Sequence, residues 1–388
     1  MQNFKLSLPT EIFFGKGQIK VLGEQVKRHG GTRVLVCYGS GRVKQQGIYD
    51  AVTTKLTGKE IPFHELGGIA PNPRITSIRE GVRLVKEHGI DFIVAIGGGS
   101  VLDCAKGIAA GARYDGDPWD LYTKKGEIRS ALPLGMVLTL AATGSEMNGT
   151  SVVTNLETKQ KLAIRLPFLK PRFSVLDPTY TFTVPPDQTA CGTVDIMSHA
   201  YEQYFSTVPG TFLSDRLGEA VLKTCLHYGP VALKEPENYE ARANLLWAAT
   251  IGLNELLTYG KTGDWATHMI GHGVAAHYDV THGVGLAILF PHWMNFVLDE
   301  RSLDKFHALA RNLWGVPISM EPMEAAREGI ARTRQFFTEL GMPARLREVD
   351  VAEEMLPTIA KTAVEFGAVG VYRKLGEAEV LEILRKAW

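Results

Sequence analysis

The sequence predicts an N-terminal α/β domain with a mainly parallel sheet, followed by an all-α domain. Short apolar runs alternate with helical patterns up to about residue 184, and helical periodicity dominates from there to the C-terminus. The change from alternating strand and helix patterns to helical patterns occurs at the sequence VPPD, residues 184–187, where two prolines favour the start of a helix. We therefore predict one domain over residues 1–184 and a second over residues 185–388, a length that suits at least two domains.

The strands of the first domain are predicted from buried apolar runs bounded by polar residues or glycine. These runs are residues 33–38, 61–66, 91–96, 133–140 and 173–177, and residues 4–15 favour a further strand or hairpin. A helix is predicted over 72–89, with Asn72 as its cap and Pro73 in its first turn, and another after the glycines that follow residue 96. In the second domain, helices are predicted over 187–206, 211–228, 237–258, 264–277, 302–313, 320–340 and 376–387.

The composition narrows the class of protein. Hydrophobic residues make up 45% and charged residues 22%, and the formal net charge is zero, so the chain can bury a large core and has no basic excess for nucleic acid or acidic membrane. No apolar run approaches the roughly 18 residues of a membrane span, and the first residues lack the layout of a signal peptide. The four cysteines are far apart, which predicts buried free thiols in a reducing compartment. We expect a cytoplasmic protein.

A glycine-rich loop, AIGGGSVLDCAKGIA, follows a predicted buried strand and opens a helix. Glycines let the backbone approach a ligand closely, and a helix N-terminus presents free N–H groups, so Gly98, Gly99 and Ser100 are predicted to bind a pyrophosphate. Leu102 stands where the Rossmann fingerprint has its third glycine, so the alternative is a tight turn without a ligand. Asp103 could bind ligand hydroxyls or lie on a solvated face.

The turn after the first strand reads YGSGRVK. Sites that prefer NAD often place an acidic residue here, whereas small Gly39 and Ser40 followed by Arg42 and Lys44 would accept a 2′-phosphate. This favours NADP over NAD, and the alternative is an ordinary turn with surface cations.

A third loop, TLAATGSEMNGTSVVTN over residues 139–155, is rich in hydroxyl and small side chains. It can supply hydrogen bonds to a cofactor, and the alternative is a polar loop without a ligand. The candidate residues in it are Thr139, Thr143, Ser145 and Asn148.

Histidines at helical spacing predict a metal site in the second domain. Asp195 and His199 are four residues apart, which places both on one face of a helix. His268 is nearly in phase with His282, but on a continuous helix the two would lie about 21 Å apart. A break in YDVTHG, residues 278–283, would bring His282 back toward His268. The two pairs could then bind Zn²⁺ or Fe²⁺ with one carboxylate and three imidazoles, and the alternative is a set of buried, hydrogen-bonded histidines.

His272 shares a helical face with His268, whereas His277 is half a turn out of phase and is predicted to be a core or rim residue.

Four stretches carry a resemblance to a known family: GGGSVLDCAK, ATGSEMN, DPTYTFTVPPDQTACGTVDIMSHAYEQY and WATHMIGHGVAAHYDVTHGVGLAILFPHW. They resemble the iron-containing (group III) alcohol dehydrogenases, in particular their butanol dehydrogenase-like branch, over roughly residues 5–385. The resemblance implies a dinucleotide-binding α/β domain and a helical metal domain, an architecture like that of dehydroquinate synthase, with the site in the cleft between them. It also implies a homodimer or larger homo-oligomer.

The resemblance assigns roles by motif match. The metal ligands fall on Asp195, His199, His268 and His282, and a nearby non-ligand histidine falls on His272. The pyrophosphate loop falls on Gly98, Gly99 and Ser100, with Asp103 behind it. The contacts on the nicotinamide side fall on Thr139, Thr143, Asn148, Lys161 and Tyr180. Three places depart from the branch. Gly273 stands where many relatives have Glu, His277 stands where relatives usually have an apolar residue, and the YGSGR turn differs from their GGGS-like turn.

The predicted function is reversible hydride transfer between a small primary alcohol and an aldehyde, such as butanol and butanal. The metal, Fe²⁺ or Zn²⁺, acts as Lewis acid, NADP or NAD carries the hydride, and His272 relays the proton or serves as a hydrogen bonder beside the site. A dehydroquinate synthase-like or glycerol dehydrogenase-like enzyme is the alternative on the same fold. The apolar residues Trp265, Met269 and Phe290 favour a small apolar substrate, and four ligand-type residues argue against a non-catalytic scaffold.

Overall fold

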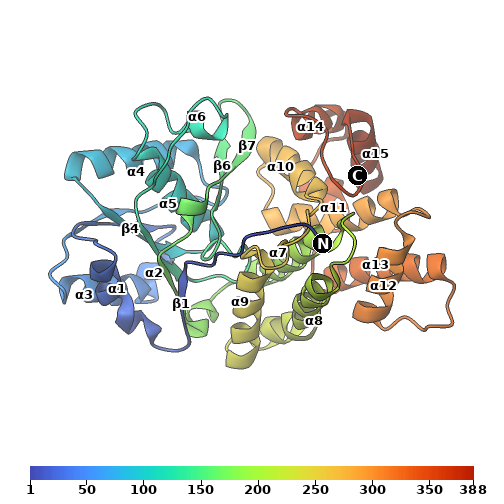
Figure 1. The fold of residues 1–388 in the computed structure, drawn as a ribbon, viewed down its shortest axis with the longest axis horizontal. Helices are drawn as coiled ribbons and strands as arrows, with labels where there is room; N and C mark the ends of the chain where they lie inside the picture. Colours follow the sequence, from blue (N-terminus) through green and yellow to red (C-terminus); the bar gives the residue numbers. More distant parts are fainter. The chain divides into compact units, whose positions relative to one another are not determined.

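The computed structural model describes residues 1–388, and the chain divides into two compact units (Figure 1). The sheet unit comprises residues 7–184 and 236–250, and the helical unit comprises residues 1–6, 185–235 and 251–388. The division at 184/185 coincides with VPPD, but two short segments belong to the unit opposite from the one predicted. Leu246 packs in an apolar core of the sheet unit, while the backbone N–H of Gln2 donates to Gly260 O, at 2.8 Å, in the helical unit.

The sheet unit is built on a six-stranded, fully parallel sheet, as predicted, in the order β1-β8-β5-β4-β2-β3. Its strands are β1 Glu11–Phe14, β2 Val34–Tyr38, β3 Phe63–Leu66, β4 Phe92–Gly97, β5 Leu134–Leu138 and β8 Phe173–Leu176. All five predicted apolar runs are strands. The opening segment contributes the edge strand β1, which pairs with β8 and forms no hairpin.

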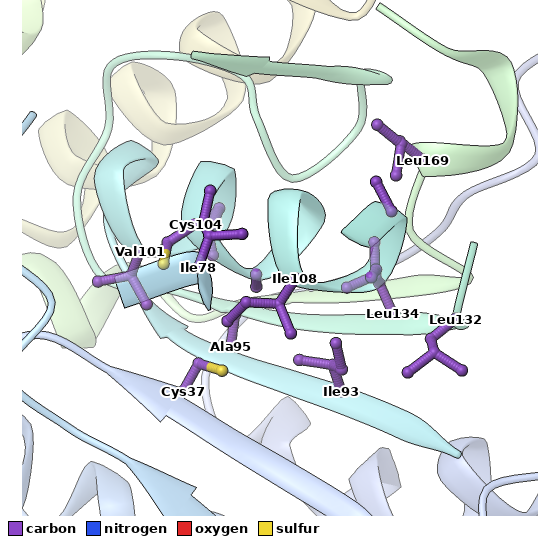
Figure 2. Packing of buried hydrophobic residues seen from close by; sticks show 14 of the residues in the cluster. Cys37, Ile78, Ile93, Ala95, Val101, Cys104, Ile108, Leu132, Leu134 and Leu169 are labelled. Carbon is purple, nitrogen blue, oxygen red and sulfur yellow. The ribbon is translucent and has the colours of Figure 1, made fainter. Parts of the chain in front are cut away.

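Helices cover both faces of this sheet. The helices are α1 Leu22–Arg28, α2 Arg42–Gln45, α3 Ile48–Thr57, α4 Ile75–His88, α5 Gly99–Gly111, α6 Trp119–Tyr122 and α9 Tyr239–Leu253, with 3-10 turns η1 Gln18–Val21, η2 Pro167–Leu169 and η3 Pro178–Thr181. Alternate residues of each strand face opposite sides. Figure 2 shows one side, where Cys37, Ile93 and Ala95 pack against Ile78 and Ile108 of α4 and α5. A second core joins the other strand face to α1 and α3.

Two local predictions need correction or extension. Asn72 is not the cap of α4, because the helix begins at Ile75 after Arg74; Asn72 has φ 51° and its Oδ1 accepts a hydrogen bond from Lys161 Nζ. Residues 139–155 were predicted as a polar loop, but their last six residues form the strand β6 Thr150–Asn155, which pairs antiparallel with β7 Gln160–Arg165. All four cysteines are buried and free, as predicted.

The helical unit is built around α7, whose residues from Thr189 to Tyr204 are all buried. Its helices are α7 Pro186–Tyr204, α8 Phe212–Lys234, α10 Ala266–Tyr278, α11 His282–Val297, α12 Leu303–Trp314, α13 Pro322–Glu339, α14 Leu356–Ala363 and α15 Glu377–Ala387, with 3-10 turns η4 Leu346–Val349 and η5 Glu353–Met355. The sequence did not predict α11 or α14. None of the helices is both long enough and apolar enough to cross a membrane.

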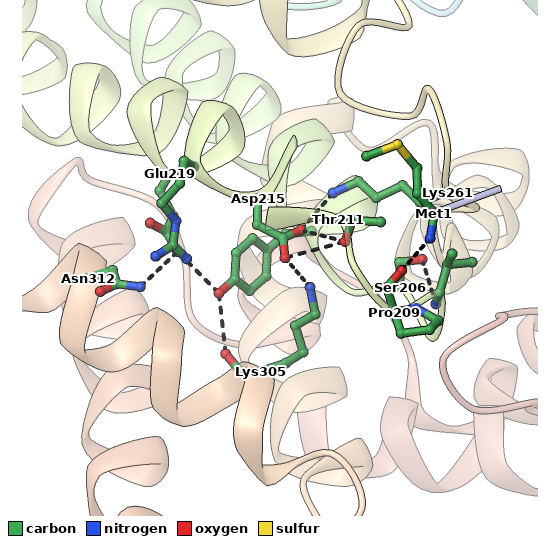
Figure 3. A network of polar contacts seen from close by, with 12 residues as sticks. Met1, Ser206, Pro209, Thr211, Asp215, Glu219, Lys261, Lys305 and Asn312 are labelled. Carbon is green, nitrogen blue, oxygen red and sulfur yellow. Dashed lines mark hydrogen bonds and ion pairs between the residues drawn. The ribbon is translucent and has the colours of Figure 1, made fainter. Parts of the chain in front are cut away.

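Polar contacts also tie the helical unit together (Figure 3). Asp215 of α8 accepts hydrogen bonds from Lys261, at 2.9 Å, and from Lys305 of α12. Glu219, one turn further along α8, accepts from Tyr204 Oη at 3.2 Å and from Asn312 Nδ2 at 3.2 Å. These pairs hold α8 against α7 and α12, away from the histidines.

Candidate metal centre and nucleotide-binding edge

Four predicted ligand residues meet in the helical unit. Asp195 and His199 come from the middle of α7, His268 from the first turn of α10, and His282 is the first residue of α11. One ligand atom from each of these four residues lies within 4.8 Å of the others. Asp195 Oδ1 is 3.8 Å from His199 Nε2 and 3.6 Å from His282 Nε2. We call this set the quartet.

The chain break that this arrangement needs is present. Helix α10 ends at Tyr278, Asp279 takes the left-handed conformation with φ 52°, and Thr281 precedes the first turn of α11. The chain therefore reverses within three residues. As a result, the rings of His268 and His282 lie 5.1 Å apart between centroids, far closer than a continuous helix would allow.

The quartet fits a small divalent ion. Burial lowers the pKa of His199 to about 4, partly opposed by the neighbouring Asp195 carboxylate, so this imidazole is neutral at pH 7, as a metal ligand must be. Two ligand atoms on one tetrahedral Zn²⁺ lie about 3.3 Å apart, from bonds of about 2.0–2.1 Å. The 3.6 and 3.8 Å separations are close to this value. Three members are buried, while the His282 side chain is 24% exposed.

Glu202 is a contact of the quartet that sequence reasoning missed. It is fully buried on α7, and its Oε1 accepts a hydrogen bond from the His268 backbone N–H at 3.0 Å and lies 2.9 Å from His268 Nδ1. Its Oε2 accepts from the Trp265 backbone N–H at 2.6 Å. Burial raises the pKa of Glu202 to about 7, against the lowering effect of the His268 and Trp265 backbone N–H groups and of Thr267. The spacing in the sequence could have indicated this residue, because positions 195, 199 and 202 share one helix face.

The other two histidines of α10, His272 and His277, point to different surroundings, as their positions around the helix predict. His272 is half-buried, and its ring centroid lies 5.7 Å from that of His282, outside the quartet. His277 Nε2 is 2.9 Å from Thr362 Oγ1 on α14. His277 therefore helps to join two helices, in line with the rim role predicted for it.

The aromatic residues predicted near the site differ in their placement. The Trp265 ring lies 5.3 Å from the ring of His268 and 6.3 Å from that of His199. Phe290, in contrast, is fully buried and packs 5.5 Å from Tyr201 in the aromatic core. Of these two, Trp265 is the one whose ring contacts rings of the quartet.

In the sheet unit, the predicted cofactor loops follow neighbouring strands. Gly39 and Ser40 follow β2, Gly98 to Ser100 follow β4, and the loop that begins at Thr139 follows β5. Because the strands are parallel, all three loops lie at the same edge of the sheet. The chain proceeds from β2 outward to β3 and then returns to β4 on the other side of β2, which makes this the switch point where open α/β sheets bind ligands.

The glycine-rich turn is also packed tightly against the loop after β5. Gly98 precedes α5, and Gly99 is its first residue. A Cβ on Gly99 would lie 2.4 Å from Thr143 Cγ2 and 2.5 Å from Thr143 Oγ1. The absence of a side chain at Gly99 therefore lets the two loops meet.

Several polar residues predicted to contact a cofactor make hydrogen bonds within the unit. Asp103 Oδ1 accepts from Ser145 Oγ at 2.6 Å and its Oδ2 from the Val152 N–H at 2.9 Å. Asn148 Oδ1 accepts from Lys106 Nζ at 3.0 Å, and Asn148 Nδ2 donates to Gly144 O at 2.9 Å. Lys106 is fully buried and was not predicted as a site residue. These contacts hold the loop after β5 onto α5.

The remaining predicted contacts lie at different places in the unit. Lys161 is buried on β7 and donates to Asn72 Oδ1 at 2.8 Å, and Tyr180 is half-buried in η3 after β8. Arg42 is exposed at the start of α2. Lys44 is engaged by Glu65, because Lys44 Nζ lies 2.8 Å from Glu65 Oε2. The bond from Lys44 holds the pKa of Glu65 below its usual range.

Comparison with known proteins places this geometry in a family. The model "Iron-containing alcohol dehydrogenase" matches residues 9–178, and "Fe-containing alcohol dehydrogenase family, C-terminal" matches residues 189–388. The chain is 48% identical over 390 residues to NADH-dependent butanol dehydrogenase A of Clostridium acetobutylicum, covering 100% of both proteins. It is 43% identical over 370 residues to the NADPH-dependent aldehyde reductase YqhD of Escherichia coli, covering 95% of this chain and 94% of that protein.

A solved structure extends the match to the fold. The crystal structure of NADH-dependent butanol dehydrogenase A from Thermotoga maritima superposes with a TM-score of 0.96 at 37% identity, covering 100% of this chain and 99% of that one. The family predicted from the sequence motifs is confirmed: the chain belongs to the iron-containing alcohol dehydrogenases.

Proposed function

We propose that the chain is a metal-dependent, nicotinamide-linked dehydrogenase that interconverts small primary alcohols and aldehydes, with butanol and butanal as representative substrates. The observation that carries the proposal is the quartet, in which a carboxylate and three imidazoles meet within 4.8 Å in a chain of this family. Relatives of the chain are named NADH-dependent butanol dehydrogenases and an NADPH-dependent aldehyde reductase, which supports the same substrate class.

The residues of the quartet would hold a divalent ion, for which we propose iron. When bound, the ion supplies Lewis acidity toward an alcohol or carbonyl oxygen, and a nicotinamide cofactor supplies or accepts the hydride. One carboxylate and three neutral imidazoles leave such a site with a net charge near +1, which favours an oxygen with developing negative charge. The partly exposed His282 marks the side on which the quartet faces solvent.

We assign the proton transfer to His272. It lies one helical turn from His268, is half-buried, and has its ring 5.7 Å from that of His282, so its ring nitrogens can pass a proton between the site and solvent. His272→Ala should lower kcat while the protein retains its metal. His277→Ala is the matched control on the same helix and should leave kcat unchanged. Equal kcat values for the two variants would remove His272 from this role.

The surroundings of the quartet support a small, fairly apolar substrate. The Trp265 ring contacts the rings of His268 and His199, which presents an apolar face beside the site. An apolar wall favours an alkyl chain over a phosphorylated acid or a polyol, because neither could satisfy its polar groups there. We therefore place butanol ahead of glycerol as a substrate.

We propose NADH as the preferred cofactor, although the sequence favoured NADP on the basis of Arg42 and Lys44. The support is the Lys44–Glu65 ion pair, which neutralises one of the two cations and places a carboxylate where it would repel a 2′-phosphate. Tyr38 Oη donates to the same Glu65 oxygen at 2.9 Å, which fixes the carboxylate in place. The names of the butanol dehydrogenase relatives point the same way.

One set of assays tests the proposal. The purified protein is loaded with Fe²⁺ or Zn²⁺ and mixed with butanal and NADH, then with NADPH, and in the reverse direction with butanol or glycerol. We expect loss of the nicotinamide absorbance with butanal, faster with NADH, and its abolition by a chelator. No absorbance change with any aldehyde in either metal form would reject the proposed activity. Light scattering on the same sample tests the proposed dimer or larger assembly.

A further inference from the structure

Glu202 places a buried carboxylate directly behind the quartet. Its side chain is 0% exposed, and its Oε1 lies 2.9 Å from Nδ1 of His268. An ionised carboxylate can only accept a hydrogen bond, so Nδ1 is the donor in this pair. An imidazole that donates from Nδ1 carries its proton there, which makes Nε2 the nitrogen with a lone pair for a metal ion. The carboxylate lies on α7, three residues from His199, so the same helix that presents two ligands also orients a third.

We infer that Glu202 is a positioning residue of the metal centre, one that fixes the tautomer and the ring orientation of His268 so that Nε2 faces the quartet. This inference rests on the proposed metal-binding role of the quartet. It adds a residue that touches neither ion nor substrate and acts only through His268.

The chemistry of the contacts explains why a carboxylate is needed. Glu202 faces three N–H donors: the ring of His268 and the backbone groups of His268 and Trp265. A carboxylate has acceptor capacity on both oxygens and accepts all three. An amide has one oxygen and one NH₂, so one of its ends must face a donor.

Both orientations of a glutamine at this position are unfavourable. If the oxygen faces His268, the NH₂ group meets the Trp265 N–H. If the oxygen faces Trp265, the NH₂ group meets the ring of His268, and Nδ1 must then accept a hydrogen bond. The ring proton then lies on Nε2, and a protonated Nε2 has no lone pair for a metal ion. Glu202→Gln therefore perturbs the metal site with almost no change of side-chain volume.

A purely structural role for Glu202 is also visible and must be separated. Helix α10 has no side-chain cap of its own, and Glu202 accepts N–H groups from its first turn, where a negative charge is favourable. Loss of this capping would lower stability without changing the tautomer of His268. The test therefore needs readouts that capping alone does not move.

The experiment compares Glu202→Gln with Glu219→Gln. Glu219 is also buried in the helical unit, where it accepts hydrogen bonds from Tyr204 and Asn312 and pairs with Arg216. It lies in the network of Figure 3 and contacts no member of the quartet. Metal-free proteins are titrated with Zn²⁺ against a competing chelator. We expect about 10- to 100-fold weaker Zn²⁺ binding for Glu202→Gln and an affinity within about twofold of wild type for Glu219→Gln. Wild-type affinity in Glu202→Gln overturns the inference.

Nuclear magnetic resonance on histidines labelled with ¹⁵N reports the tautomer directly in the wild-type protein and does not depend on whether Glu202→Gln folds. In the metal-free wild-type protein, His268 should be the Nδ1–H tautomer, with its signal assigned by its loss in His268→Ala. An Nε2–H tautomer overturns the inference whether or not Glu202→Gln folds. If the wild-type protein binds no Zn²⁺, the proposed metal site fails instead, so the two failures are distinguishable.

Discussion

Gly283 is the residue whose substitution tests most directly how the quartet is held together. It is the second residue of α11, next to His282, and a Cβ at this position would lie 2.3 Å from the carbonyl oxygen of Cys191 on α7. The same Cβ would lie 2.8 Å from the carbonyl carbon and the Cα of Cys191. All three atoms are backbone, so a side-chain rotation cannot relieve the contact.

The size of the displacement follows from these distances. An ordinary contact for a Cβ begins at 3.4 Å, so the start of α11 in Gly283→Ala must move away from α7 by about 1 Å. Overpacking of this kind destabilises a protein by about 1–3 kcal/mol. His282 moves with Gly283, while Asp195 and His199 stay on α7. A shift of about 1 Å is half of a metal–nitrogen bond of about 2.0–2.1 Å, so we expect weaker Zn²⁺ binding and a loss of kcat on the order of 100-fold.

The matched control is Gly285→Ala, two residues further along the same helix. A Cβ at Gly285 has no atom within 4 Å, so alanine adds no clash and removes the conformational freedom of a helical glycine. This control should be stabilised by about 0.5–1 kcal/mol with unchanged metal affinity. The assay is chelator competition with Zn²⁺, together with thermal unfolding of the metal-free proteins. If Gly283→Ala retains both its Zn²⁺ affinity and its melting temperature, the close approach of α11 and α7 does not hold His282 in place.

Three further predictions concern other parts of the chain. Gly99→Ala should raise the KM for NADH without removing metal, because the added Cβ overlaps the loop after β5. Gly41→Ala is the control, since a Cβ there has no atom within 4 Å, and its KM should be unchanged. Equal KM values for the two variants would count against the loop as a cofactor site. Glu65→Gln should raise the NADPH:NADH ratio of kcat/KM by about two- to fivefold, because it releases Lys44 from its ion pair. An unchanged ratio would reject the Lys44–Glu65 pair as a determinant of cofactor preference. Burial and then nearby cations lower the pKa of His292 from 6.5 to about 4, so the stability it contributes is complete above about pH 6.5 and is lost as the pH falls toward 4. The loss of stability reaches about 2 kcal/mol at pH 5. In denaturant unfolding of the metal-free proteins, the free energy of unfolding of His292→Asn should therefore fall less between pH 7 and pH 5 than that of wild type. Equal decreases would contradict the assignment.

Helical phase was enough to sort the histidines, because it is a local property. The spacing of His268, His272 and His277 fixes which of them share a face, and Asp279 and Thr281 mark the break before His282. The approach of α7 to α10 could not be derived in this way. The two helices are joined through the packing of segments more than sixty residues apart. Spacing could therefore only offer the four residues as one possible set, and the family resemblance assigned them as ligands.

The elements that were missed are those in which packing overrides local preference. Helix α11 has Gly283, Gly285 and Pro291, residues with low helix propensity, yet it forms because most of its length is buried against neighbouring helices. One of the residues that lower its propensity, Gly283, is also what allows α11 to lie against α7. A propensity argument therefore points the wrong way at the place where the fold needs close backbone contact.

Charged residues show the same limit for the site. Glu202 and Lys106 are fully buried, although a charge in a sequence is ordinarily taken as a solvated residue. Asp103 and Asn148 were predicted to face a cofactor, and each makes hydrogen bonds to the loop after β5. Sequence located the polar residues of the site, but which of them face inward depends on partners that only the folded chain brings near.

The division of the quartet between helices follows from what a metal site requires. Two ligands lie in the middle of α7, which is buried along most of its length and is therefore a well-packed support. The other two lie at the beginnings of α10 and α11, and the short break between these helices sets their separation. A single helix could not surround an ion, because its ligands lie on one face only. The junction supplies the opposing side, and it also leaves His282 as the one member of the quartet that remains partly exposed to solvent.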